Sequence, residues 1–304
     1  MMTSIKRNKA FIWGLILLIT LLWGYAWVAM KDVLHYMGPF TFTSFRFGSG
    51  TLVLFLVVWL SKKGTASIKT YWKSLLIQGI LQTAIVFLLV MYGLKFVDAG
   101  KSSVLLYSMP LWSSILAVWF LKEKLTLMKL IGLIFGIVGL LTIVGWDVWI
   151  HSDPETLFGE LLIIIAAISW GSSNVYYRMK LEHLPKIETN AYQMLFGTIL
   201  IIIVTSFTEW HEPITLNAHS LYYIIFTGVL ASALCFTVWY VILGLIDIVT
   251  ATISTQLVPI FGLFFSAILL GERLSIGVIT GAGMIITGIL IAQLHTGKRA
   301  RDTE

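Results

Sequence analysis

Arg46 is the residue of this sequence with the clearest chemical potential, because it places a permanent charge within an apolar stretch. It lies seven residues after Pro39, which corresponds to roughly 10 Å along a helix that rises about 1.5 Å per residue. A charge at that depth costs roughly 3 kcal/mol in an apolar medium and usually marks a ligand pathway or an ion pair. Its planar guanidinium fits a carboxylate or a phosphate. The alternative interpretation is an arginine whose head group reaches the polar interface.

Tyr107 and Gln256 form a second set of candidates, since each stands three residues before a proline, Pro110 or Pro259. A proline removes a backbone donor, so each helix should kink or flex at that point, and we predict that the two prolines are hinges or cavity walls. An ordinary packing role is the alternative, because proline is common in membrane helices. Hydroxyls and amides that face lipid lack hydrogen bonds, so both polar side chains should point inward.

Five further residues complete the candidate binding set. Aromatic and amide side chains within apolar helices can line a cavity, and a cavity of that kind suits a zwitterionic or amphipathic guest. The alternative is that they join helices by packing and hydrogen bonds alone. The five residues are Trp23, Gln82, Trp170, Asn174 and Gln193.

The sequence lacks the groups that a membrane-embedded enzyme would need. All six histidines lie in loops or near the ends of apolar stretches, and Asp98, Glu160 and Asp247 also stand near stretch ends. We therefore expect neither a catalytic pair nor an obvious proton relay. The single cysteine, Cys235, cannot build a disulfide or a thiolate metal site. No metal and no cofactor are expected.

The composition indicates an integral membrane protein. Of the 304 residues, 58% are hydrophobic and 12% are charged, and the mean hydropathy is +0.90, which a soluble domain of this size would not tolerate at its surface. A helix needs roughly 20 apolar residues to cross a bilayer. Ten stretches meet this need, near 11–30, 41–60, 73–94, 101–121, 127–146, 157–177, 188–207, 220–243, 249–270 and 275–294.

Lysine and arginine gather in alternate connections between these stretches, including 62–73, 122–129 and 178–186. Positive residues favour the cytoplasmic side of a membrane. We therefore expect a multi-pass protein of the cell membrane with both termini in the cytoplasm. The net charge of +6 then reports orientation, and nucleic acid is not an expected partner.

The second half of the chain repeats the first at a nearly constant offset. Five spans make one unit, so we predict one unit at 9–148 and another at 156–296. Because five is odd, the second unit enters the membrane upside down. The predicted fold is an all-α integral membrane protein of ten transmembrane helices in two inverted five-helix repeats. The matched pairs are Trp23 and Trp170, Asp98 and Asp247, Pro110 and Pro259, Glu123 and Glu272, and Leu125 and Leu274.

The chain resembles the drug/metabolite transporter superfamily, EamA group, in three features that occur in both units. They are Trp-Gly in the first helix, a proline in the middle of the fourth helix, and E-[KR]-L-[ST] at the end of the fourth helix. The resemblance implies a secondary transporter, often an exporter of amino acids or related small metabolites, with a central cavity between its halves. Its partners would be a small-molecule substrate and the lipid bilayer. A membrane-embedded enzyme and a non-transporting receptor or scaffold are the alternatives.

Small residues recur in the last span of each unit, as Gly132-x3-Gly136 and Gly277-x3-Gly281. Such faces allow two helices to approach closely. We interpret them first as packing surfaces and second as a seam for a homodimer.

Overall fold

The computed structural model describes residues 9–61, 66–122, 127–150, 153–245, 255 and 257–294. Within these residues the secondary structure is helical and contains no strand. The elements are α2 (Lys9–Asp32), a 3-10 turn η1 (Val33–His35), α3 (Pro39–Leu60), α4 (Ala66–Gly79), η2 (Ile80–Ala84), α5 (Ile85–Gly93), α6 (Ala99–Leu106), α7 (Met109–Phe120), α8 (Leu127–Ile150), α9 (Pro154–Lys180), α10 (Lys186–Thr208), α11 (Ala218–Ile225), η3 (Phe226–Leu234), α12 (Cys235–Leu245), α14 (Leu257–Phe265), η4 (Ser266–Leu270) and α15 (Ile276–Leu294).

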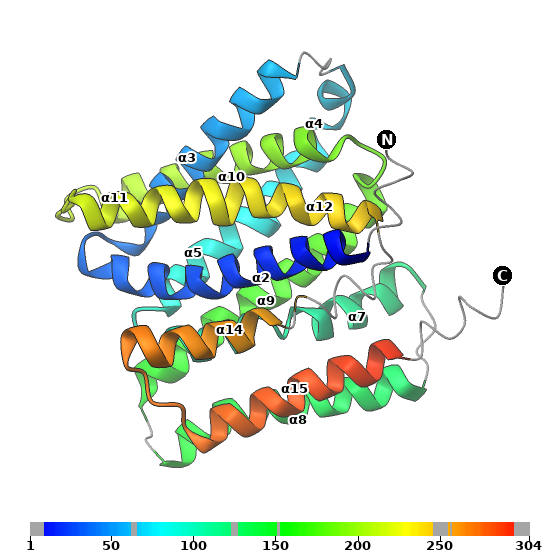
Figure 1. Ribbon diagram of the computed structural model, residues 1–304, viewed down its shortest axis with the longest axis vertical. Coiled ribbons are helices and arrows are strands. Elements are labelled where there is room, and N and C mark those ends of the chain that lie inside the picture. Colours follow the sequence, from blue (N-terminus) through cyan, green and yellow to red (C-terminus); the bar gives the residue numbers. More distant parts are fainter. Residues whose placement is uncertain are drawn as a thin grey trace.

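These elements assemble into ten apolar spans. Within the described residues, seven helices are long and apolar enough to cross a membrane, and three shorter apolar helices accompany them. The spans run side by side, and α2 begins at the same end of the bundle at which α15 finishes (Figure 1). The predicted fold class is confirmed: the protein is an all-α membrane fold of two inverted five-helix repeats.

The outer surface of the bundle is apolar. Large hydrophobic side chains are exposed on helices all around the molecule, including Leu52 on α3, Trp119 on α7 and Phe207 on α10. Lipid is the solvent that such a surface requires, since water would drive these side chains together. The polar side chains instead turn inward, where residues such as Thr43, Gln78 and Gln193 are fully buried.

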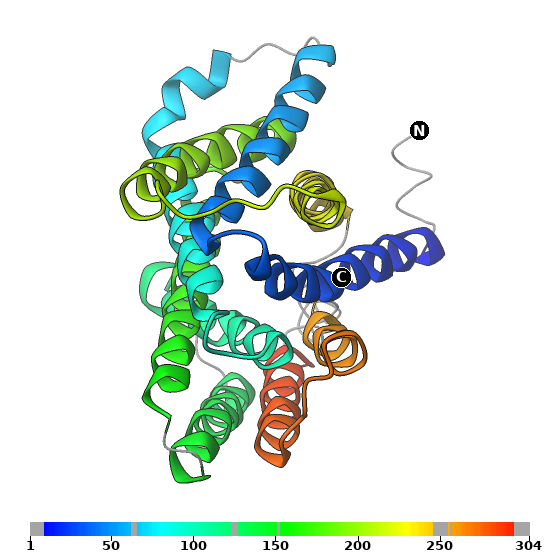
Figure 2. The same ribbon diagram turned by 90° about the vertical axis from the view of Figure 1, so that its left-hand side faces the viewer.

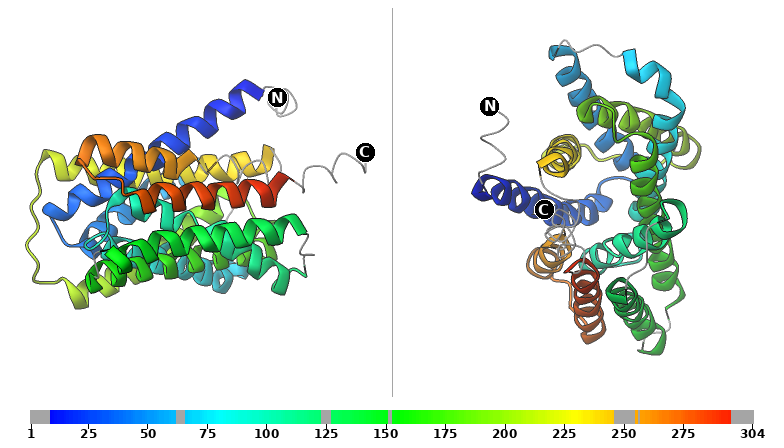
Figure 3. Two further views of the ribbon diagram at one scale, coloured as in Figure 1. Left: turned by 90° about the horizontal axis from the view of Figure 1, so that it is seen from below. Right: turned by 90° about the vertical axis from the view of Figure 1, so that its right-hand side faces the viewer.

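Helices α8 and α15 lie side by side along their length at one edge of the bundle (Figures 2 and 3). Glycines let their backbones meet. A Cβ atom built on Gly139 would lie 2.7 Å from the carbonyl oxygen of Gly281, and one built on Gly288 would meet the carbonyl oxygen of Gly132. A Cβ on Gly136 would meet Leu111 of α7. The predicted small-residue faces therefore pack within the chain.

Gly281→Val is expected to destabilise the protein, because its Cβ would lie 2.6 Å from the carbonyl oxygen of Gly139 and also meet Ile143. Overpacking of this kind costs roughly 1–3 kcal/mol. Gly283 on the same helix is the matched control, since a Cβ there has nothing within 4 Å. Thermal unfolding in detergent should show a lower melting temperature for Gly281→Val alone. Equal melting of the two variants would contradict the close α8–α15 contact.

Several spans depart from regular α-helix. The fourth span divides into α6 and α7, with Tyr107 and Ser108 between them. The third and eighth spans contain π-helical segments, η2 and η3, and π turns often occur where a helix serves a function. Residues 80–84 of η2 correspond to 227–231 at the repeat offset of 147 found from Trp23 and Trp170, so the two segments occupy matching places in the repeats.

Candidate functional site

A small cavity lies at the centre of the bundle, between helices of both halves. Its volume is about 30 Å³, which is room for one or two water molecules. Helices α2, α3, α5 and α6 of the first half and α9 and α12 of the second half contribute to it. The lining residues are Trp23, Ala26, Trp27, Met30, Arg46, Phe87, Leu106, Tyr107, Trp170 and Phe236.

Arg46 is enclosed in this centre, with only 2% of its surface exposed, so the interpretation of an arginine that reaches the interface is wrong. Its Nε donates to Ser232 Oγ at 3.0 Å, and its Nη1 donates to the sulfur of Met30 at 2.7 Å. The guanidinium carbon lies 4.6 Å from the ring centroid of Phe87 and 5.1 Å from that of Phe47. Among the described residues, no carboxylate forms an ion pair with Arg46.

The surroundings of Arg46 stabilise a cation only weakly. Hydroxyl and sulfur acceptors carry no formal charge, and a cation over an aromatic ring gains about 2 kcal/mol when desolvated. A buried charge that lacks a counterion is costly. An anion that entered the cavity would therefore gain a strong, charge-assisted interaction with the guanidinium.

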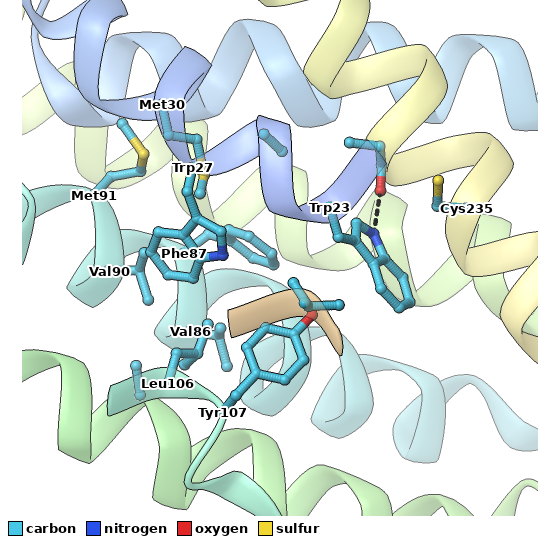
Figure 4. Close-up of a cluster of buried hydrophobic side chains, with 14 of the residues drawn as sticks. Trp23, Trp27, Met30, Val86, Phe87, Val90, Met91, Leu106, Tyr107 and Cys235 are labelled. Atoms are coloured by element: carbon cyan, nitrogen blue, oxygen red, sulfur yellow. Dashed lines mark hydrogen bonds between the residues drawn. The ribbon is translucent and has the colours of Figure 1, made fainter. Parts of the chain in front are cut away.

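Tyr107 reaches the cavity because its helix stops there. It follows the last residue of α6, and its backbone has turned out of helical geometry, with φ −76° and ψ 10°. Its ring packs edge-on against Trp170 at a centroid distance of 5.9 Å. Figure 4 shows its hydroxyl pointing toward α2, between Phe87 and Trp23. Tyr107 is buried, and among the described residues no hydrogen-bond partner approaches this hydroxyl.

The break before Pro110 is bridged by backbone hydrogen bonds of the turn type. Pro110 stands in the first turn of α7, where a missing backbone donor costs least. Ser108 N donates to Leu105 O at 3.2 Å, and Leu111 N donates to Ser108 O at 2.9 Å. The fourth span is therefore interrupted just before Pro110, and the role of this proline as a hinge stays a prediction. In the ninth span, Pro259 lies in α14, and much of the stretch before it lies outside the described residues.

Trp23 and Trp170 bring aromatic surface to the cavity from the opening helix of each half. Trp23 Nε1 donates to the carbonyl oxygen of Ala231 in η3 at 2.8 Å, the bond drawn in Figure 4. Its ring also contacts Phe236 and Trp239, at centroid distances of 5.6 and 6.2 Å. The π-helical segment η3 thus holds both Trp23, through Ala231, and Arg46, through Ser232.

Four of the eight candidate binding residues, Arg46, Tyr107, Trp23 and Trp170, meet at the cavity, and three others do not line it. Gln82 accepts a hydrogen bond from Gln78 at 2.6 Å. Gln193 accepts from Thr83 at 2.8 Å and donates to Asn190 at 2.9 Å. Asn174 donates to the sulfur of Met109 at 2.9 Å. In these bonds Gln82 acts within the third span, whereas Gln193 joins that span to α10. Gln256 lies outside the described residues.

Several residues at the cavity were not among those predicted from the sequence. Trp27 and Met30 follow Trp23 by four and seven positions, which is one face of a helix, so this spacing could have revealed them. Ser232 and Phe87 carry no such signal, because their contacts with Arg46 depend on how η3 and α5 are rotated.

The model of the EamA-like transporter family matches residues 10–145 and again residues 157–293. The chain belongs to the EamA-like transporter family. Each match covers one five-helix set, so the family pattern occurs twice, as the duplication does. Membership of this family makes the EamA-like protein a multi-pass membrane transporter.

Several relatives of this EamA-like chain are named as transporters or efflux pumps. It is 33% identical over 284 residues to an uncharacterized transporter, YoaV, of Bacillus subtilis (strain 168), covering 93% of this chain and 97% of that one. It is 24% identical over 285 residues to a probable amino-acid metabolite efflux pump of Salmonella typhimurium, covering 91% and 93% of the two chains. A crystal structure of a protein with 17% identity matches with a TM-score of 0.68, over 94% of this chain and 98% of that one. At this level of identity, the similarity to that structure shows the fold alone.

Proposed function

We propose that this protein is a secondary transporter that exports small metabolites carrying an anionic or zwitterionic group, by alternating access. The observation that carries the proposal is that Arg46 is buried at a cavity built by both halves, where no carboxylate of the described residues pairs with it. Arg46 would bind the anionic group, and Tyr107, Trp23 and Trp170 would contact the rest of the substrate. The names of the efflux pumps among its relatives support the direction of transport.

The size of the cavity supports alternating access. A space of about 30 Å³ is far below the roughly 300 Å³ or more of a typical ligand pocket. A metabolite therefore needs the halves to separate before it can reach Arg46. Inverted repeats provide two matching ways of opening, one toward each side of the membrane.

A test of the proposal uses the purified protein in detergent and then in liposomes. Carboxylates, amino acids and organic cations are first screened for an increase in melting temperature, because a ligand that binds the folded state stabilises it. The compounds that stabilise are then tested for counterflow in proteoliposomes. We expect stabilisation and exchange by anionic or zwitterionic compounds. Stabilisation by cations alone, or binding without any exchange, would contradict the proposal.

The fourth span is proposed to bend at the gap between α6 and α7 during this cycle. Pro110→Ala restores a backbone donor next to the gap and favours a continuous helix. The variant should insert and fold, yet exchange substrate several-fold more slowly, because a stiffer helix hinders the conformational step. Pro213→Ala, in the exposed connection after α10, is the control. A normal exchange rate in Pro110→Ala would show that this proline has only a packing role. The same role is proposed for Pro259.

The orientation is also part of the proposal. The lysine-rich connections favour both termini in the cytoplasm, and the connection between α8 and α9 would then lie on the outer side of the membrane. Ala66→Cys and Ser152→Cys, each in a Cys235→Ser background, can be labelled from outside intact cells with an impermeant maleimide. We expect labelling at residue 152 and none at residue 66. Labelling at residue 66 and none at residue 152 would show that the orientation is the opposite of the proposed one.

A further inference from the structure

Two helices of the first repeat begin at one end of the bundle without a cap of their own. The residue before α3 is Gly38, which has no side chain to donate or accept, and the residue before α6 is Asp98, whose side chain makes no capping bond. The first turn of a helix exposes backbone N–H groups that must find acceptors. At α3 and α6 these acceptors have to come from elsewhere in the chain.

Carboxylates of the second repeat supply them. Glu272, which follows η4, accepts from Ala99 N at 2.7 Å and from Gly100 N at 3.0 Å. Glu209, which follows α10, accepts from Phe40 N at 3.1 Å, and from Thr41 N and Thr41 Oγ1 at 2.7 and 2.8 Å. We name the end of the bundle where these bonds lie the carboxylate end; it is the left-hand end in Figure 1.

We propose that Glu209 and Glu272 are latches that hold the carboxylate end closed, and that this end opens when they release α3 and α6. This inference rests on the proposed function in one respect, since it requires the central cavity to open toward the membrane surface. Each latch joins one matched half of the chain to the other, so separating the halves at this end breaks both.

The chemistry of the latches allows repeated opening. A carboxylate at a helix N-terminus contributes only modestly to stability, and it contributes less when it is exposed than when it is partly buried. Glu209 and Glu272 are both partly exposed, so water can solvate the carboxylate and the N–H groups once they part. Glu160, by contrast, is fully buried and paired with Lys101, which makes that pair a poor candidate for a contact that water replaces.

Asp153 provides a matched control at the same end of the bundle. Its carboxylate caps its own helix, α9, by accepting from Glu155 N at 3.2 Å and Thr156 N at 3.3 Å. Asp153→Ala therefore removes a helix cap that does not cross between the halves. Glu212→Ala removes an acidic side chain from the connection that also holds Glu209, and serves as a control for charge.

The experiment measures how fast a cavity residue reacts from each side of the membrane. Ala26 lines the cavity and is buried, so Ala26→Cys in a Cys235→Ser background reports opening without any substrate. An impermeant maleimide is applied to intact cells and, separately, to inverted vesicles. Glu272→Ala, Glu209→Ala and the milder Glu272→Gln are compared with Asp153→Ala and Glu212→Ala. Melting temperatures are recorded for every variant.

We expect the latch variants to react several-fold faster from the side of the carboxylate end, with the alanine variants faster than Glu272→Gln and the controls unchanged. An increase seen only in inverted vesicles would support the latches while reversing the proposed orientation. Unchanged rates in the latch variants, or an equal increase in Asp153→Ala, would overturn the inference. If the latch variants label faster but the unchanged protein transports no substrate, the proposed function is rejected while the latch inference stands.

Discussion

Replacing Arg46 by glutamine is expected to weaken the binding of an anionic substrate by at least roughly tenfold, and to leave the binding of a neutral analogue nearly unchanged. A charge-assisted hydrogen bond in a buried site is worth about 1.5–3 kcal/mol, and about 1.4 kcal/mol corresponds to a factor of ten. Glutamine keeps a polar group close to Ser232 but removes the charge. Arg46→Lys keeps the charge but loses the planar fork, so its affinity for the anionic substrate should fall between that of the unchanged protein and that of Arg46→Gln.

The measurement compares dissociation constants for an anionic ligand and its neutral amide or ester. The fold should tolerate Arg46→Gln, because Arg46 has no carboxylate partner among the described residues and its removal relieves a desolvation cost. Gln193→Ala is the matched control. It stands at the repeat-equivalent position, with hydrogen bonds to Thr83 and Asn190 and no place in the cavity lining, so it should affect both ligands equally. Equal losses for both ligands in Arg46→Gln would make Arg46 structural.

Breaking the ion pair between Lys101 and Glu160 is expected to produce the largest loss of stability. Lys101→Met leaves a charged carboxylate at a site that is fully buried. Removing one partner of a buried pair typically costs about 3–5 kcal/mol. We expect the melting temperature in detergent to fall by about 10 °C, given roughly 2–4 °C per kcal/mol in chains of 150–250 residues.

The double variant Lys101→Met/Glu160→Leu separates this explanation from a general packing defect. Replacing both charges by apolar side chains removes the buried carboxylate that Lys101→Met leaves behind, and such replacements are often neutral or stabilising. The double variant should therefore recover most of the lost melting temperature. A double variant as unstable as Lys101→Met would show that the charge pair is not the cause.

The sequence predicted the spans and the repeat well, because both depend on patterns along the chain. Runs of apolar residues reveal membrane helices, and the matched pairs such as Pro110 and Pro259 reveal the duplication. The same patterns say which residues share a helix face. They therefore brought Arg46, Tyr107, Trp23 and Trp170 into one set, and these four residues do meet.

What the sequence could not predict depends on how helices rotate against one another. Gln82 and Gln193 looked equivalent to the cavity residues, yet they bond to Gln78 and Thr83 away from the cavity lining. Glu160 stands near the start of α9, as expected for a terminal acid, but it is fully buried because Lys101 packs against it. The π-helical segment η3, which carries Ser232 to Arg46, has no sequence signal that we could identify.

The contact between α8 and α15 also has the pattern of a contact between two equivalent chains. At the offset of 149 that relates Pro110 to Pro259, Gly132 corresponds to Gly281 and Gly139 corresponds to Gly288. In the structure Gly132 meets Gly288, and Gly139 meets Gly281. Such exchange, in which position i touches j′ and j touches i′, is the signature of an isologous interface with two-fold symmetry. The seam expected between two separate subunits is thus present inside one polypeptide, as if a homodimer of five-helix chains had become covalently joined and kept its pseudo-two-fold axis.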